Sequence, residues 1–78
     1  MFFNRAKKKV ISVDGMTDNF CAEKIGENLV SLVDVSKVKV DLKKKCIIVS
    51  YENSVDDILL QETIEKMGYI VTGIKEIC

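Results

Sequence analysis

The order in which hydrophobic periodicity changes along the chain constrains its fold more than any other feature of the sequence. Alternating apolar and polar residues indicate a half-buried strand, whereas apolar residues spaced three and four positions apart indicate one face of a helix. The elements predicted in this way are a strand at 8–14, a helix at 19–33, strands at 35–42 and 46–51, a helix from about 53 to 68, and a strand at 69–75.

The order strand–helix–strand–strand–helix–strand is typical of one architecture. It predicts an α+β, ferredoxin-like βαββαβ sandwich, in which two helices cover one face of a four-stranded antiparallel sheet. A lysine-rich turn at 43–45 joins the two middle strands into a hairpin. Exposed lysines at such a turn protect a sheet edge from aggregation, and they also attract an acidic partner.

Capping residues indicate where the two helices begin and end. Either Asp18 or Asn19 is able to cap the first helix. Ser54 and Asp57 form a loose capping box for the second, and a glycine at position 68 is a common way to end a helix. Gly73 suggests a bulge in the last strand.

Length and charge exclude several classes of protein. The 78 residues predict a single domain over 1–78, with a core at about 8–75. Twelve basic and twelve acidic residues give no net charge, which disfavours nucleic-acid binding. No apolar run approaches the roughly 20 residues of a membrane span. The N-terminus also lacks the residue order of a secretory signal, so we expect a cytoplasmic protein.

The loop from Gly15 to Cys21 is the strongest candidate for a functional site. Gly15 permits a tight turn, and Cys21 falls in the first turn of the predicted helix. Free N–H groups and the positive end of the helix dipole favour a thiolate at such a position. The chain has no histidine, so a soft-metal site here needs sulfur or oxygen ligands. A redox role is a weaker alternative because the loop has no second, resolving cysteine.

Gly15-Met16-Thr17, followed by Cys21, resembles the G-M-T-C-x-x-C loop of heavy-metal-associated domains. That family includes copper metallochaperones and the N-terminal modules of metal-pumping P-type ATPases. The resemblance covers about residues 8–74 and implies that the last strand lies beside the first. The loop is degenerate, GMTDNFC, because Asp18 stands where the family has its first cysteine.

The resemblance implies a small, soluble, non-enzymatic metal-binding protein that is similar to a metallochaperone. Cys21 is then the main ligand for Cu(I) or Zn(II), and Asp18 is a possible second. Tyr69 shields the site, and Met16 and Thr17 are its neighbours, with Met16 directed into the core. Asp18 also has a simpler explanation, since aspartate is a favoured helix cap.

The resemblance also implies the kind of partner. A metal-transporting P-type ATPase, or another acceptor that bears thiols, would exchange the ion with a monomer or with a metal-bridged dimer. The alternative is a metal-free ferredoxin-like module that only contacts another protein. Strand alternation places Cys46 at the Cys21 end of the sheet but on its bare face, and Cys78 at the opposite end.

Overall fold

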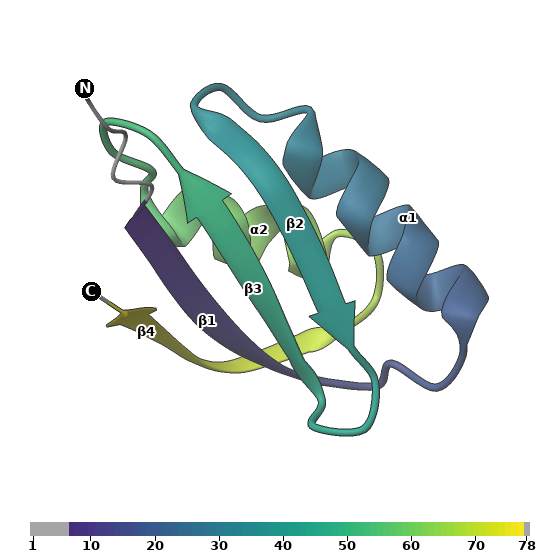
Figure 1. Cartoon of the computed structure of the whole chain (residues 1–78). Coiled ribbons are helices and arrows are strands. Elements are labelled where there is room, and N and C mark those ends of the chain that lie inside the picture. The colour runs from purple at the N-terminus through teal and green to yellow at the C-terminus, as the bar shows by residue number, and fades with distance from the viewer. Residues whose placement is uncertain (1–6, 78) are drawn as a thin grey trace.

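The computed structural model describes residues 7–77, which form one antiparallel sheet with two helices (Figure 1). The elements are β1 (Lys7–Asp14), α1 (Asn19–Val30), β2 (Val35–Asp41), β3 (Cys46–Tyr51), α2 (Asp57–Glu65) and β4 (Ile70–Ile77). The sheet order is β2-β3-β1-β4, and every neighbouring pair is antiparallel. The ferredoxin-like fold, with the last strand beside the first, is therefore confirmed.

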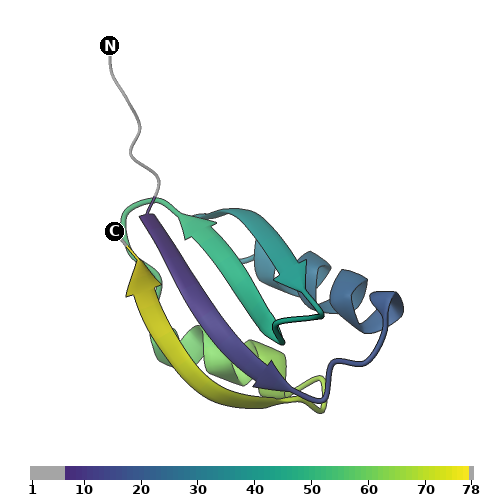
Figure 2. The same ribbon diagram turned by 60° about the horizontal axis from the view of Figure 1, so that its bottom comes forward.

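The core lies between the central strands and the two helices. Alternate residues of β1 and β3 face the helices and are almost fully buried; they are Ile11, Val13, Ile47 and Val49. Both helices lie on this side of the sheet (Figure 2) and contribute Ile25, Leu29, Leu60 and Ile64, each with no exposed surface. Burial of one such side chain is worth about 1.5–3 kcal/mol, so this single layer holds the helices to the sheet.

Helix α1 is shorter than its periodicity predicts. It ends at Val30 rather than at residue 33. Asp34 has a left-handed backbone, with φ of 73°, and this turns the chain into β2. Leu32 still packs against the core, whereas Val33 is 83% exposed. The apolar stripe therefore continues past the point where the hydrogen-bonded helix stops.

The predicted start of the second helix is wrong. Helix α2 is capped by Asp56, whose Oδ1 accepts from the backbone N–H of Ile58 at 3.0 Å. The predicted cap, Ser54, lies before the helix because Val55 is buried in an extended connection. Neither helix of residues 7–77 is long and apolar enough to cross a membrane.

The predicted bulge in the last strand is present. Pairing of β1 with β4 changes from Ser12 opposite Gly73 to Val13 opposite Val71, which leaves Thr72 without an opposite residue. An extra residue of this kind bends the strand and increases its twist. The curve of β4 is visible in Figure 1.

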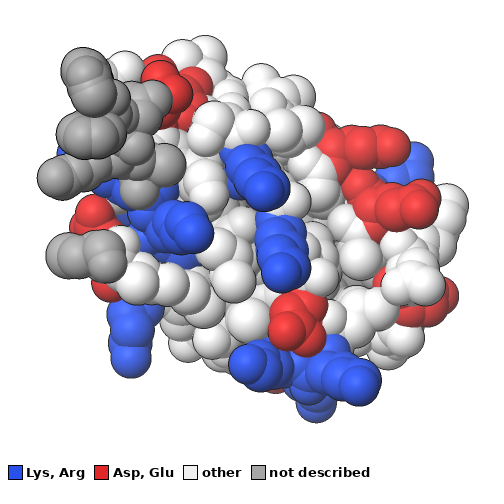
Figure 3. Space-filling model, in the orientation of Figure 1, with Lys and Arg blue, Asp and Glu red and all other residues white. Residues whose placement is uncertain are grey.

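The second face of the sheet carries no helix in the part of the chain that the structure describes. Figure 3 views the molecule from this side and shows lysines spread over the strands and gathered at the β2–β3 hairpin. Carboxylates gather instead at the right of the view, beside α1. We call this surface the open sheet face; its central residues are Lys8, Val10, Lys37, Lys39, Ile48 and Lys75.

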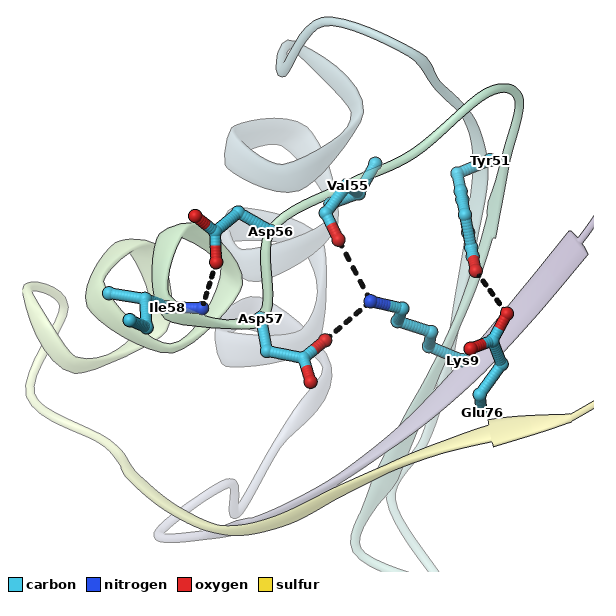
Figure 4. Close-up of polar contacts among 7 residues, drawn as sticks. All are labelled: Lys9, Tyr51, Val55, Asp56, Asp57, Ile58 and Glu76. Atoms are coloured by element: carbon cyan, nitrogen blue, oxygen red, sulfur yellow. Dashed lines mark hydrogen bonds and ion pairs between the residues drawn. The ribbon is translucent and has the colours of Figure 1, made fainter.

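A lysine is buried at the end of the core nearest the two termini. Lys9 points toward the helix side of β1 and is 8% exposed. Its Nζ donates to the carbonyl of Val55 at 2.8 Å and forms an ion pair with Asp57 (Figure 4). The same Nζ lies 5.3 Å from the ring centre of Tyr51, whose hydroxyl donates to Glu76 at 2.6 Å. Lys9 therefore links β1 to Val55 and Asp57 at the start of α2.

Replacement of Lys9 with alanine should lower the free energy of unfolding by about 1–3 kcal/mol, because the Val55 carbonyl loses its donor. Lys8→Ala removes the neighbouring, exposed lysine and should change this free energy by less than about 0.5 kcal/mol. Urea denaturation followed by circular dichroism measures both values. Equal losses in the two variants would show that the cluster adds nothing to stability.

Candidate functional site

Three connections meet at the end of the sandwich farthest from the start of β1 and the end of β4 (Figures 1 and 2). They are the loop between β1 and α1, the β2–β3 hairpin, and the turn between α2 and β4. The backbone N–H of Val13 donates to the carbonyl of Lys45 at 3.0 Å and ties the hairpin to the end of β1. Alternation of strand direction therefore brings the predicted site residues to one end of the fold.

Gly15 and Tyr69 are in contact across this end. Gly15 has a φ of +102°, a conformation that favours glycine, and a Cβ atom at this position would lie 3.2 Å from Cδ1 of Tyr69. The glycine thus allows both the turn and the close approach of the aromatic ring. Met16 is buried in the core, as predicted, and Thr17 is exposed in the loop.

Asp18 is the N-cap of α1. Its backbone is extended, and its Oδ1 accepts from the backbone N–H of Cys21 at 3.0 Å. This backbone hydrogen bond is the main reason that the pKa of Asp18 is lowered, and the Cys21 side chain adds to the effect. The resulting stabilisation is present above the ordinary aspartate value and is lost as the pH falls through the lowered pKa.

Cys21 lies in the first turn of α1 as a half-buried free thiol. Hydrogen bonding with the Cys21 side chain is the largest cause of a raised pKa for Tyr69. Desolvation and the negative charges of Cys21 and Asp18 raise the pKa of Tyr69 further. The Tyr69 hydroxyl therefore keeps its proton to a higher pH than an ordinary tyrosine does.

Within residues 7–77, no three Cys, Asp or Glu side chains gather closely enough to hold a metal ion, and the chain has no histidine. Cys21 and Asp18 therefore offer two donors, one soft sulfur and one hard oxygen. Cys46 is a second free thiol, and strand alternation puts it on the open sheet face, because Ile47 is buried against the helices. Cys78 lies outside the described residues.

Phe20 belongs to the same loop segment, but no role at this end of the molecule was predicted for its side chain. Phe20 directly precedes Cys21, and 67% of its surface is exposed. Lys24 Nζ lies 5.7 Å from its ring centre. The sequence feature that indicates an exposed Phe20 is its position outside the apolar stripe of α1, because a residue there does not face the core.

The link between Cys21 and Tyr69 is open to a direct test. Cys21→Ala removes the largest cause of the raised pKa, so the pKa of Tyr69 should fall toward the ordinary tyrosine value. An NMR pH titration of labelled tyrosine rings separates Tyr69 from Tyr51. Cys46→Ala serves as the matched control and should leave the titration of Tyr69 unchanged. An identical titration in wild type and Cys21→Ala would contradict this geometry.

Comparisons with known proteins agree with the geometry. A family model described as the heavy-metal-associated domain matches residues 10–69. The copper chaperone CopZ of Staphylococcus haemolyticus (strain JCSC1435) is 39% identical over 64 residues, which cover 81% of this chain and 94% of the relative.

Solved structures of related domains have the same fold. The yeast copper transporter domain CCC2A superposes with a TM-score of 0.84 at 28% identity, over 92% of this chain and 100% of that domain. The N-terminal domain of a potential copper-translocating P-type ATPase from Bacillus subtilis has a TM-score of 0.80 at 25% identity, over 94% and 92%. Since the family model spans most of the chain, this protein belongs to the heavy-metal-associated domain family.

Proposed function

We propose that this protein binds a soft heavy-metal ion as cargo, through Cys21 as the main ligand and Asp18 as the second. The observation that carries the proposal is the position of Cys21, which is a half-buried free thiol in the first turn of α1, at the end of the fold where the Tyr69 ring contacts Gly15. The relatives are named as a copper chaperone and as domains of copper transporters, which favours a non-enzymatic role in metal handling.

The mixed donor pair determines which ion is held and how firmly. Cu(I) prefers thiolates, and a carboxylate oxygen is a poor substitute for the second sulfur. Zn(II) accepts sulfur and oxygen together. We therefore propose weak binding of Cu(I), with Zn(II) as the competing ion. Asp18 already accepts one hydrogen bond from Cys21, which further limits what this carboxylate offers to a metal.

Weak binding suits an ion that is shared and then transferred. A partner thiolate forms a bond to the ion while the bond to Cys21 breaks, and the oxidation state of the metal does not change. The acceptor is a metal-transporting P-type ATPase or another thiol-bearing protein, by analogy with the relatives. Cys21 and Cys46 are both free thiols, which fits action in the reducing cytoplasm.

Anaerobic Cu(I) titration against a competing chelator tests the ligand assignment. Asp18→Cys should bind Cu(I) at least about tenfold more tightly than wild type, or about 1.4 kcal/mol, because it restores a pair of sulfur ligands. Cys21→Ser should lose binding, and Cys46→Ser is the matched control that should keep it. If the wild-type protein does not bind Cu(I), or binds it equally well without Cys21, the metal-binding proposal is wrong. The alternative of a metal-free interaction module is then favoured.

If one Cu(I) is bound between two chains, the protein should dimerise when the metal is added. One Cu(I) per two chains should convert part of the wild-type protein into a dimer, since two Cys21 thiolates then supply the sulfur pair that one loop lacks. Light scattering during size-exclusion chromatography measures the mass. The dimer should disappear in Cys21→Ser and persist in Cys46→Ser, and the opposite pattern would place the bridging sulfur at Cys46.

A further inference from the structure

Strand register places an apolar centre between two lysines on the open sheet face. Lys39 of β2 pairs with Ile48 of β3, Ile48 with Val10 of β1, and Val10 with Lys75 of β4. These four residues form one row across the sheet. The two lysines at its ends are exposed, and the two aliphatic residues between them are half-buried.

The neighbouring row of residues across the sheet adds two further lysines to this face. It consists of Lys37, Ser50, Lys8 and Ile77. The carboxylates of this face, Asp14 and Asp41, lie toward the site end, and Asp41 Oδ1 accepts from the backbone N–H of Lys44 at 3.1 Å. Lysines therefore dominate the part of the open sheet face that is far from Cys21 (Figure 3).

The helix layer carries the opposite charge. Its exposed acidic residues are Glu23, Glu27, Asp56, Asp57, Glu62 and Glu65, against two lysines, Lys24 and Lys66. A formal net charge of zero thus conceals a separation of charge between the two faces. Such a separation creates a local positive potential that steers an acidic partner to the sheet, even though the whole chain is neutral.

A shallow hollow lies beside the apolar centre. It is lined by Val10, Ser12, Gly73, Ile74 and Lys75. Gly73 has no side chain, and an added Cβ there would have no atom within 4 Å. The missing side chain at Gly73 therefore leaves room next to Val10 for an apolar side chain from another molecule.

We propose that the open sheet face is a docking surface for an acidic amphipathic helix of a protein partner. Strands β3 and β1 are already paired on both sides, so their main chains do not accept another strand. Three strand spacings separate Lys39 from Lys75, about 14 Å, and this width brackets a helix of about 10 Å diameter. The apolar stripe of that helix covers Val10 and Ile48, and its flanking carboxylates pair with the lysines.

The chemistry of the face favours a protein helix over nucleic acid. Proteins that bind single strands stack bases on aromatic side chains. Among residues 7–77, the open sheet face presents aliphatic residues at its centre, and Tyr51 points to the opposite, buried side. Docking here leaves the loop of Cys21 uncovered, so the surface functions independently of metal binding.

A designed peptide tests the complementarity directly. The probe is an 18-residue helical peptide with a leucine stripe flanked by glutamates, about 27 Å long, which matches the length of an eight-residue strand. Its counterpart replaces each glutamate with lysine. NMR shift mapping on the full, unmodified chain should place the acidic peptide over Val10, Ile48 and Lys75, with binding that weakens as salt rises.

Charge reversal provides the matched comparison. Lys39→Glu with Lys75→Glu should weaken binding of the acidic peptide by about tenfold or more. Lys24→Glu with Lys66→Glu makes the same change in net charge on the helix layer and should alter binding by less than about twofold. Circular dichroism establishes that both double variants are folded, and Cys21→Ser should bind the peptide like wild type even if it binds no metal.

Several outcomes would overturn the docking proposal. These are failure of the acidic peptide to bind, shifts confined to the helices or to the hairpin, equal weakening by the two double variants, and equal binding of the lysine counterpart. Tighter binding of a single-stranded DNA of matched charge would assign the face to nucleic acid instead. Because the shift mapping uses the unmodified chain, a variant that fails to fold does not remove the test.

Discussion

Burial of one face of the two central strands is the constraint on which the remaining structure depends. Side chains of β1 and β3 that point to one side have no exposed surface, or almost none, and both helices are held against them. A shift of either strand by one residue would turn this apolar set to solvent. The packing therefore determines the register of the sheet, and the register determines which connections meet at each end.

The loop of Cys21 lies at one end because of this arrangement, and the buried Lys9 cluster lies at the other. At the loop end, Gly15 and Asp18 determine the path of the loop. Gly15 has no side chain and so allows the Tyr69 ring to approach, and Asp18 caps α1. At the far end, charged groups fasten the start of α2 to the sheet. The candidate site thus lies on a short loop between two elements that pack on the core.

Asp18 illustrates how one residue serves the fold and alters the chemistry. Its carboxylate accepts a hydrogen bond from the first turn of α1, a task that aspartate performs well. The same substitution leaves one sulfur where the family has two. Under the proposed function, the start of α1 keeps its cap while the loop has one soft ligand fewer, so its affinity for a soft ion is expected to fall.

The sequence by itself determined the element order, the fold class and the position of Cys21, because periodicity and short motifs are local properties. The stop of α1 at Val30 and the start of α2 at Asp57 were decided by tertiary contacts. The Asp34 carbonyl accepts from the backbone N–H of Glu52 at 2.8 Å, and Val55 is buried. Only the folded chain reveals that Lys9 is buried and that lysines from three strands surround an apolar centre. These features join residues far apart in sequence, and their spacing depends on how strands pair, which no local pattern encodes.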